Sequence, residues 1–315
     1  MKIGGFFELE LNSGIEYHDG ALRLNTGRNA FEYVLRAGDY SKVFLPYYIC
    51  NVMLKPLKKT DTPYDFYHID ENFFPIFDFG QIGSNEALLY INYFGICGSN
   101  VKKLSQHRIN LVVDNAQAFF FKPRKDVATF YSGRKFFGVP DGAYLYTERP
   151  IDDVFEYETS RNRMSHLLSR IEDGPNVSYE KFKRNSISIG DSPIRRMSKI
   201  SQRVFKNIDY NFVKKRRREN FHYLHYHLAK RNQIKIDLSE QEVPMVYPFL
   251  PEKQMLQNEI IKKGVYIAKY WKNVEHWVEK NTVEYQYSTG ILPLPIDQRY
   301  STEHMDFILK AVIDC

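Results

Sequence analysis

The sequence predicts an α/β protein with two parts: a large domain built on a mostly parallel sheet covered by helices, and a smaller α/β domain that follows it. Three observations support this prediction. Short, continuously apolar segments alternate with helix-like segments between residues 42 and 147, which is typical of a buried parallel sheet. Polar and charged residues replace this pattern after Pro150. A long stretch without proline or glycine then begins at Ser201 and leads into a second, shorter α/β pattern.

In the first part, we expect strands at residues 42–46, 64–70, 87–95, 110–114, 127–132 and 143–147. Residues 48–59 place Ile49, Val52, Met53 and Leu57 at helical spacing, so they predict a helix between the first two strands. A loop and a short helix are expected after residue 95.

In the second part, turn-forming residues at 172–176 and 189–193 predict loops, and one long helix is expected from Ser201 to about Arg231. A helix around residues 252–263 and a strand-like segment at 264–268 follow. The last helix begins at Ser301–Thr302, because a hydroxyl side chain with Glu303 close behind has N-cap chemistry. We therefore divide the chain into residues 1–200 and 201–315.

The composition is that of an ordinary globular protein, with 315 residues of which 43% are hydrophobic and 26% charged. The net charge of +6 would attract a phosphorylated small molecule or nucleic acid and does not decide between them. The odd number of cysteines (Cys50, Cys97 and Cys315) is typical of a reducing compartment. Glu8 and Glu10 interrupt any signal-peptide core, and no apolar stretch approaches the roughly 18–20 residues of a membrane span. The expectation is a cytoplasmic protein without a membrane partner.

The first candidate functional segment is an anion-binding turn. Thr26, Gly27, Arg28 and Asn29 directly precede the helical spacing of residues 31–35. A glycine at a helix start lets backbone N–H groups approach an anion, and an arginine there adds a charged donor. The alternative is an ordinary N-cap turn.

The second candidate is Asp114, which closes an apolar strand. A carboxylate at such a position is costly to bury unless it is paired, and a protonated ring nitrogen would be a suitable partner. Gln117 lies one helical turn further on. Asp114 as the N-cap of a following helix is an alternative that is compatible with this interpretation.

The third candidate is Lys135, which lies between an apolar strand and the turn at residues 138–142. A partly buried lysine loses its charge readily and can form a Schiff base with an aldehyde. Ser132 and Arg134 are possible anion ligands beside it. The alternative is a lysine that extends from an apolar stretch into solvent.

Taken in order, these segments resemble the sugar-nucleotide aminotransferases of the DegT/DnrJ/StrS type. The resemblance covers nearly the whole chain and is carried by TGRNAF at 26–31, LPYYIC at 45–50, INYFG at 91–95, VVDNAQA at 112–118, FYSGRKFFGVPDGAYL at 130–145 and ILPLPIDQRYSTEHMDFIL at 291–309. The aspartate element, followed by Ser-x-x-Lys and an acidic-Gly turn, is its specific part.

The resemblance implies the type I fold of pyridoxal phosphate enzymes, a homodimer, and amino transfer from an amino acid, with glutamate expected, to a keto group of a nucleotide-linked sugar. It implies that Lys135 forms the Schiff base with pyridoxal 5'-phosphate and moves the proton, and that Asp114 holds the ring nitrogen. It also places Gln117 against the ring. The phosphate would be held by Gly27, Arg28, Asn29 and Ser132, and Tyr48 and Cys50 would lie where the family stacks an aromatic residue on the ring.

The sequence departs from the family at several positions. Arg28 follows Gly27 where a Gly-Thr pair is usual, Cys50 lies near the aromatic position, and Asp141 begins a turn that is usually Glu-Gly-Gly. The chain is also shorter than is usual after the lysine.

The alternatives are a pyridoxal phosphate-dependent sugar dehydratase and a non-catalytic or regulatory protein of this fold. The dehydratases of the family carry histidine in place of the lysine, so Lys135 argues against that alternative. Nucleic-acid binding would rest only on the charge and on the basic run at residues 214–218, and it is not expected. His222, His225 and His227 lack convincing ligand partners, so no metal site is expected.

Overall fold

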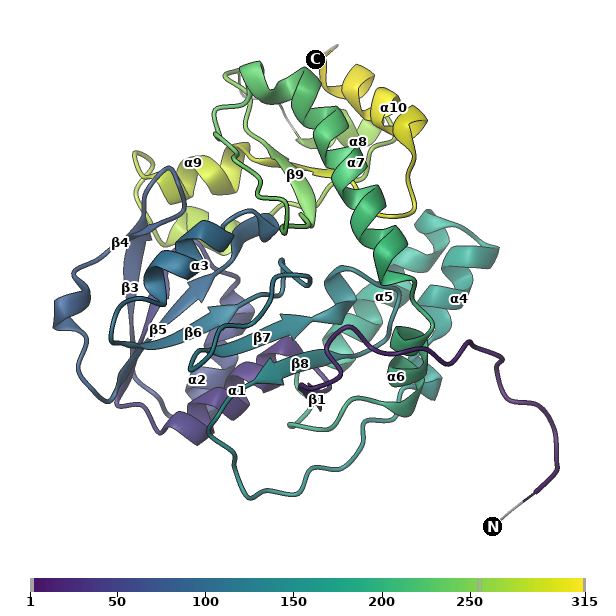
Figure 1. Ribbon diagram of the computed structural model, residues 1–315. Coiled ribbons are helices and arrows are strands. Elements are labelled where there is room, and N and C mark those ends of the chain that lie inside the picture. Colours follow the sequence, from purple (N-terminus) through teal and green to yellow (C-terminus); the bar gives the residue numbers. More distant parts are fainter. Residues whose placement is uncertain (1–2, 254, 256, 314–315) are drawn as a thin grey trace.

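A mostly parallel sheet forms the centre of the larger body of the molecule (Figure 1). The computed structural model describes residues 3–253, 255 and 257–313. Within them the sheet has eight strands in the order β1-β8-β7-β6-β5-β2-β3-β4. The neighbours from β7 to β3 are parallel, whereas β8, β1 and β4 add antiparallel edges. The predicted fold class is confirmed.

The strands of the described residues are β1 (Leu22–Leu24), β2 (Lys42–Pro46), β3 (Tyr64–Ile69), β4 (Pro75–Ile76), β5 (Glu86–Ile91), β6 (Asn110–Asp114), β7 (Ala128–Ser132), β8 (Ala143–Tyr146), β9 (Val246–Phe249) and β10 (Leu292–Pro295). Their α-helices are α1 (Gly27–Gly38), α2 (Leu54–Lys59), α3 (Gly98–Leu104), α4 (Ser165–Glu172), α5 (Pro175–Ser188), α6 (Lys199–Lys206), α7 (Tyr210–Leu228), α8 (Gln257–Lys262), α9 (Val283–Gly290) and α10 (Thr302–Ile313).

Helices cover both faces of the main sheet, with α3 in front of it and α1 and α2 behind it in Figure 1. Strands that are buried on both faces must be apolar throughout, which is why β5 carries Leu88 and Leu89 in succession without solvent exposure. The six predicted strands are confirmed, although β5 ends at Ile91. The short edge strands β1 and β4 were not predicted.

The single long helix predicted from Ser201 to Arg231 is wrong. α6 ends at Lys206, and α7 begins at Tyr210. Between them, the Asp209 carboxylate accepts a hydrogen bond from the Phe212 N–H at 2.9 Å. This N-cap satisfies a free N–H group of the new helix, so the chain turns here without proline or glycine.

The strand-like segment predicted at residues 264–268 is also wrong, because those residues form no strand. Instead β9 pairs antiparallel with β10. Val265 and Ile267 are buried in a second core with α7 and α10, so their alternation reflects burial in an irregular segment.

Two helices, α4 and α5, occupy the polar region after Pro150 and were not predicted. α4 buries only His166 and Ser169, and α5 buries only Ser178 and Asn185. The apolar periodicity that reveals a core-facing helix is therefore missing. The predicted loops at 172–176 and 189–193 correspond to the turn between these helices and to the loop after them.

Two other predicted helices are shorter than expected. In the segment 48–59, helical structure begins only at Asn51. In the segment 252–263, α8 covers Gln257–Lys262, and residues 254 and 256 lie outside the described residues.

The C-terminal part has its own core around Phe221, Leu224, Tyr247, Leu294 and Met305. Residues Val274, Tyr287 and Ile291, however, belong to the core of the main sheet. The boundary at residue 200 stays a prediction, because the chain after it contributes to both cores.

Cys50 and Cys97 are free thiols, and Cys315 lies outside the described residues. Among the helices of the described chain, none combines the length and the apolar character that a bilayer crossing requires.

Candidate active site

The carboxyl ends of β6 and β7 meet the start of α1 at one edge of the main sheet. Asp114 is the last residue of β6, Ser132 is the last residue of β7, and Lys135 ends the 3-10 turn that follows (Gly133–Lys135). A Cβ atom placed on Gly27 would lie 3.8 Å from the Cβ of Ser132. This edge is where open α/β sheets bind their ligands.

Asp114 is a buried carboxylate with one free oxygen. It is 7% exposed, and its Oδ1 accepts a hydrogen bond from the Ala116 N–H at 2.7 Å. Its Oδ2 accepts no hydrogen bond from any described residue. Burial raises the pKa of Asp114 to about 6, although the Ala116 N–H and the charge of Lys135 act against the rise. A cationic donor beside the free oxygen would stabilise the charged form.

Part of the Lys135 side chain is exposed to solvent, and its ammonium group lies among protein atoms. The residue is exposed, but protein atoms surround its ammonium group closely enough that burial lowers its pKa. Arg134 also lowers this pKa, whereas Cys50 and Asp114 act in the opposite direction. The ammonium makes no hydrogen bond or salt bridge within the described chain, and its Nζ lies 5.6 Å from the centre of the Tyr270 ring.

A positively charged surface at the start of α1 lies next to the lysine. Thr26 caps α1 by accepting the Asn29 N–H at 3.1 Å, and Ser132 lies beside the first turn with no hydrogen-bond partner among the described side chains. Burial lowers the pKa of Arg28, and burial together with the charge of Arg28 lowers the pKa of Arg134 to about 10. Two neighbouring guanidinium groups lie at a helix N-terminus, and neither of them is in a salt bridge in the described chain, so their charges would suit a doubly charged anion.

Gln117 holds the turn at Phe94 and Gly95 through a side-chain hydrogen bond. Its Oε1 accepts the Phe94 N–H at 2.7 Å, where Phe94 has a φ of 54°. A Cβ on Gly95, which has a φ of 76°, would lie 2.8 Å from the Gln117 carbonyl oxygen. Gln117 thus fixes a tight turn, and its amide nitrogen has no hydrogen-bond partner in the described residues.

Two of the predicted cofactor residues are engaged elsewhere. The Asn29 amide donates to the Asn25 side chain and to the carbonyl oxygens of Ser192 and Pro193. Tyr48 is 0% exposed and packs in the core against Tyr93 and Trp271. Cys50 is partly exposed and close enough to affect the pKa values of Arg28 and Lys135. The structure thus brings Gly27, Arg28, Cys50, Asp114, Gln117, Ser132 and Lys135 together, and it gives the Asn29 and Tyr48 side chains other surroundings.

Comparison with solved structures places this geometry in a known fold. Spr1654 of Streptococcus pneumoniae, assigned as a sugar aminotransferase and solved in its PMP form, is 16% identical over 92% of this chain and 86% of its own, with a TM-score of 0.65. DesV of S. venezuelae, solved with a ketimine intermediate, is 15% identical over 93% and 84%, with a TM-score of 0.63. A DegT/DnrJ/EryC1/StrS aminotransferase of Brucella abortus is 13% identical over 94% and 86%, with a TM-score of 0.60.

The chain has the same fold as these three solved aminotransferases. No family model and no curated protein matches the sequence. At these identities the likeness establishes the architecture, and the roles of the residues depend on the geometry described above.

The sequence does not identify Tyr270, whose ring lies beside the ammonium group of Lys135. Tyr270 lies in the C-terminal part, and burial raises its pKa to about 12. No local pattern marks it, because only the packing of the two parts brings it to the lysine.

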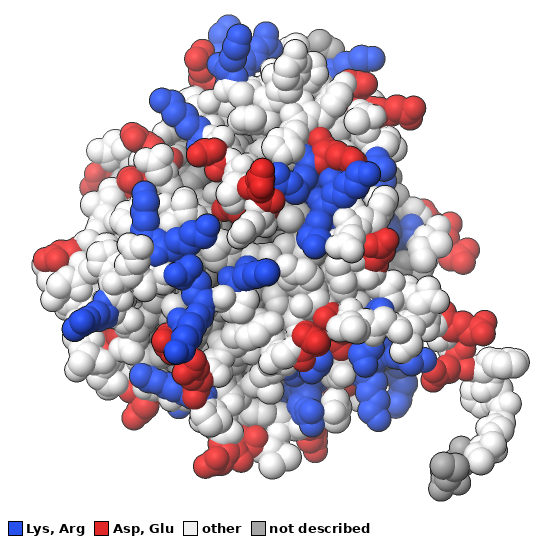
Figure 2. Space-filling view, in the orientation of Figure 1, with Lys and Arg blue, Asp and Glu red and all other residues white. Residues whose placement is uncertain are grey.

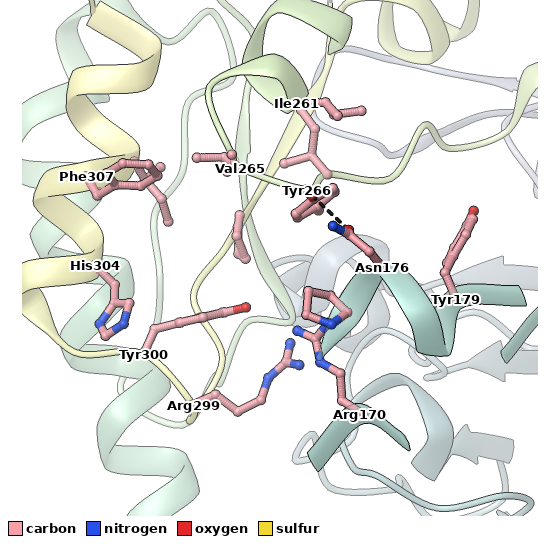
Figure 3. Close-up of a pocket in the computed structure, with 15 residues that line it drawn as sticks. Arg170, Asn176, Tyr179, Ile261, Val265, Tyr266, Arg299, Tyr300, His304 and Phe307 are labelled. Atoms are coloured by element: carbon pink, nitrogen blue, oxygen red, sulfur yellow. Dashed lines mark hydrogen bonds between the residues drawn. The ribbon is translucent and has the colours of Figure 1, made fainter. Parts of the chain in front are cut away.

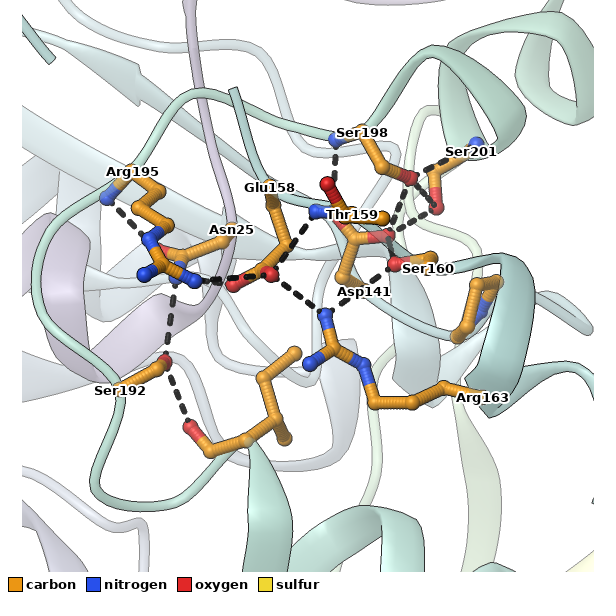
Figure 4. Close-up of polar contacts among 12 residues, drawn as sticks. Asn25, Asp141, Glu158, Thr159, Ser160, Arg163, Ser192, Arg195, Ser198 and Ser201 are labelled. Carbon is orange, nitrogen blue, oxygen red and sulfur yellow. Dashed lines mark hydrogen bonds and ion pairs between the residues drawn. The ribbon is translucent and has the colours of Figure 1, made fainter. Parts of the chain in front are cut away.

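A network of buried polar groups surrounds Asp141, which lies in the turn that follows Lys135 (Figure 4). The Asp141 carboxylate accepts hydrogen bonds from Ser198 N–H at 2.8 Å and from the hydroxyl groups of Ser160, Ser198 and Ser201 at 2.6–2.7 Å. The next residue, Gly142, has a φ of 130° and accepts the Gly133 N–H at 3.0 Å. The turn that carries Lys135 is therefore fastened to the start of α6.

A cavity of about 670 Å³ lies between the α4–α5 hairpin and the C-terminal part (Figure 3). Its walls are largely apolar and aromatic, and the guanidinium groups of Arg170 and Arg299 point into it (Figure 3). The Tyr266 hydroxyl donates to the side-chain oxygen Oδ1 of Asn176 at 3.0 Å and so connects the two parts. Gln298, next to Arg299, donates to the Phe136 carbonyl oxygen at 2.9 Å. The cavity is thus joined to the residue that follows Lys135.

Proposed function

We propose that the protein is a pyridoxal phosphate-dependent aminotransferase that moves an amino group from an amino acid, with glutamate as the expected donor, to a keto group of a nucleotide-linked sugar. One observation carries the proposal. Lys135 and Asp114 interact electrostatically across a partly open space, and each presents an unpartnered polar atom there.

The residues present fit the cofactor. The free oxygen of Asp114 is a suitable acceptor for a protonated ring nitrogen, and the helix start with Arg28, Arg134 and Ser132 is suitable for a phosphate. When bound, pyridoxal phosphate supplies an electron sink that stabilises the carbanion formed at the amino donor.

The residues of the chain then have distinct tasks. An ionised Asp114 would keep a proton on the ring nitrogen of a bound cofactor, because the opposite charges would stabilise one another more strongly in this partly buried site than in bulk water. Burial and Arg134 lower the pKa of Lys135, so a neutral amine is available at lower pH than for a free lysine. A neutral amine can attack a carbonyl and can accept the proton from the donor's α-carbon.

The cavity between α4–α5 and the C-terminal part supports a nucleotide-linked acceptor. Its volume lies in the usual range for a small-molecule site, which is about 300–1,000 Å³. Arg170, which makes no salt bridge in the described chain, provides a charge for a phosphate, and the aromatic walls provide surfaces for a base.

A homodimer belongs to the same proposal. Exposed apolar side chains gather on the α4–α5 hairpin, where Ile171 and Ile187 are 81% and 71% exposed. A patch of this kind is typical of an association surface. We also propose a cytoplasmic location, in keeping with the cysteine content.

The first experiment follows the cofactor. Purified protein mixed with pyridoxal phosphate is expected to develop a visible absorption band, and borohydride is expected to fix the cofactor mass on the peptide that contains Lys135. Lys135→Ala removes both signals, whereas the exposed control Lys58→Ala keeps them. An unchanged band and an unchanged labelled peptide in Lys135→Ala would show that the nucleophile is misassigned.

The second experiment separates transfer from the alternatives. In a single turnover without a sugar acceptor, an aminotransferase loaded with pyridoxal phosphate converts glutamate to 2-oxoglutarate, because the amino group passes to the cofactor, and the absorption band shifts. A non-catalytic protein keeps the cofactor without this half-reaction, and a dehydratase acts on a sugar without consuming glutamate.

A further inference from the structure

The basic run at residues 214–218 on α7 is divided by its helical geometry. Lys215 and Arg216 lie 3.9 and 3.6 Å from the carboxylate of Glu219. Arg217 is 1% exposed and donates to the carbonyl oxygens of Pro244 and Met245. Lys214 and Arg218, one turn apart, share the remaining face.

That face borders a hollow of about 490 Å³. Five cationic side chains line it: Lys102 from α3, Lys122 and Arg124 from the loop before β7, and Lys214 and Arg218 from α7. In the described part of the chain, none of these five takes part in a salt bridge. Glu240 is the carboxylate among the lining residues. Figure 2 shows basic side chains gathered on the face that carries α3 and α7.

Four residues that line the hollow are aromatic or apolar, and we refer to them together as its floor: Tyr17, Phe120, Phe121 and Val243. The Nζ of Lys214 lies 5.8 Å from the centre of the Tyr17 ring. Arg218 is fixed in place, because its Nη1 donates to the carbonyl oxygens of Ser239 and Glu242 at 2.9 and 2.7 Å. Aromatic and apolar side chains therefore line the same hollow as a cluster of positive charges, of which Arg218 is held in place.

Five cations that face one hollow with a single carboxylate, Glu240, among its described lining residues repel one another, and an anion with several charges would relieve that repulsion. The aromatic floor offers stacking to a ring attached to such an anion. We propose that this hollow binds a nucleoside di- or triphosphate, with its phosphates on the lysines and arginines and its base on the floor.

The hollow is separate from the site at Lys135. The buried Phe120 ring packs against Phe136 with 5.8 Å between their centres, so an aromatic cluster lies between the two sites. The inference therefore does not depend on the proposed aminotransferase function. A nucleic-acid duplex is a less suitable ligand, because Lys215 and Arg216 share the carboxylate of Glu219 and the remaining cations converge on a pocket.

Binding of ADP and of inorganic pyrophosphate to the full-length protein, measured by calorimetry, tests the proposal. We expect ADP to bind more tightly than pyrophosphate, and both to weaken several-fold between 50 and 200 mM salt. The exposed double substitution Lys122→Glu/Arg124→Glu is expected to weaken ADP binding by at least about tenfold, because it reverses two of the five charges. Lys215→Ala, on the same helix but outside the hollow, leaves binding unchanged, and so does Lys135→Ala.

Three results would overturn the proposal. ADP binding that survives Lys122→Glu/Arg124→Glu but is lost in Arg170→Ala would place the nucleotide in the cavity of Figure 3 instead. Pyrophosphate binding as tight as that of ADP would remove any role for the floor. Duplex DNA that displaces ADP and depends equally on Lys215 would identify a nucleic-acid surface.

Discussion

At the residue scale, the buried carboxylate of Asp114 has a cost in stability. Burial raises its pKa from the usual 3.8 to about 6, so ionising it costs more in the folded protein than in the unfolded chain. The favourable contribution of the protonated group is fully present below pH 3.8 and is lost as the pH rises through 6. A shift of two pKa units corresponds to about 3 kcal/mol.

Asp114→Asn is therefore expected to stabilise the cofactor-free protein at pH 8, by up to about 3 kcal/mol, and to change it little near pH 4. Urea unfolding at the two pH values measures this difference. Asp141→Asn is the matched control. It is expected to destabilise at pH 8, because Asp141 accepts four hydrogen bonds. Equal destabilisation by both changes at pH 8 would mean that Asp114 already has a partner without cofactor.

Asp114, Ser132 and Lys135 could be predicted because each follows a strand that the sequence marks clearly, and the ends of parallel strands meet at one edge. The hydrogen bonds of the Asn29 side chain and the core packing of Tyr48 could not be predicted. The chain places them beside the right segments, but the directions of their side chains depend on contacts with Pro193 and Trp271, which are remote in sequence.

At the element scale, the start of α1 and the turn after β7 together carry the proposed phosphate site. Arg28→Gln and Arg134→Gln are each expected to weaken pyridoxal phosphate binding by about tenfold or more, since a charge-assisted hydrogen bond contributes roughly 1.5–3 kcal/mol. Binding of pyridoxal, which lacks the phosphate, should change little. Arg36→Gln, in the last turn of α1, is the control.

Titrations followed by absorbance compare the two ligands. An equal loss of affinity for pyridoxal and for its phosphate would show that the arginines support the fold rather than the phosphate.

Elements were predictable where they face a core. Six strands of the main sheet carry apolar patterns that match their burial, and so does α10, whereas the short edge strands β1 and β4 were not predicted. The α4–α5 hairpin could not be found in this way, because its apolar residues face outward. The break between α6 and α7 depends on a single capping aspartate, which a propensity pattern does not distinguish from an ordinary helical residue.

At the scale of the whole molecule, Arg217 joins the two parts. It stacks on Phe136, with 4.5 Å from its Cζ to the ring centre, and it donates to Gln298 and to the carbonyl oxygens of Pro244 and Met245. Arg217→Met is expected to lower the free energy of unfolding by about 2–4 kcal/mol, because buried acceptors lose their donor. Arg216→Met, at a partly exposed pair, should change it by less than about 1 kcal/mol.

Chemical unfolding of both variants measures the contrast. A loss no greater in Arg217→Met than in Arg216→Met would show that water replaces the guanidinium group. Such long-range joints lie beyond any reading of the sequence, since the partners are far apart along the chain.

The bond between Gln298 and the Phe136 carbonyl group has a mechanical consequence. Gln298 holds the peptide group that follows Lys135 through this hydrogen bond. Its neighbour Arg299 borders the cavity between the α4–α5 hairpin and the C-terminal part. A ligand that displaced Arg299 in that cavity would therefore also shift the turn that carries Lys135, so occupancy of the cavity and the position of the amine would be linked.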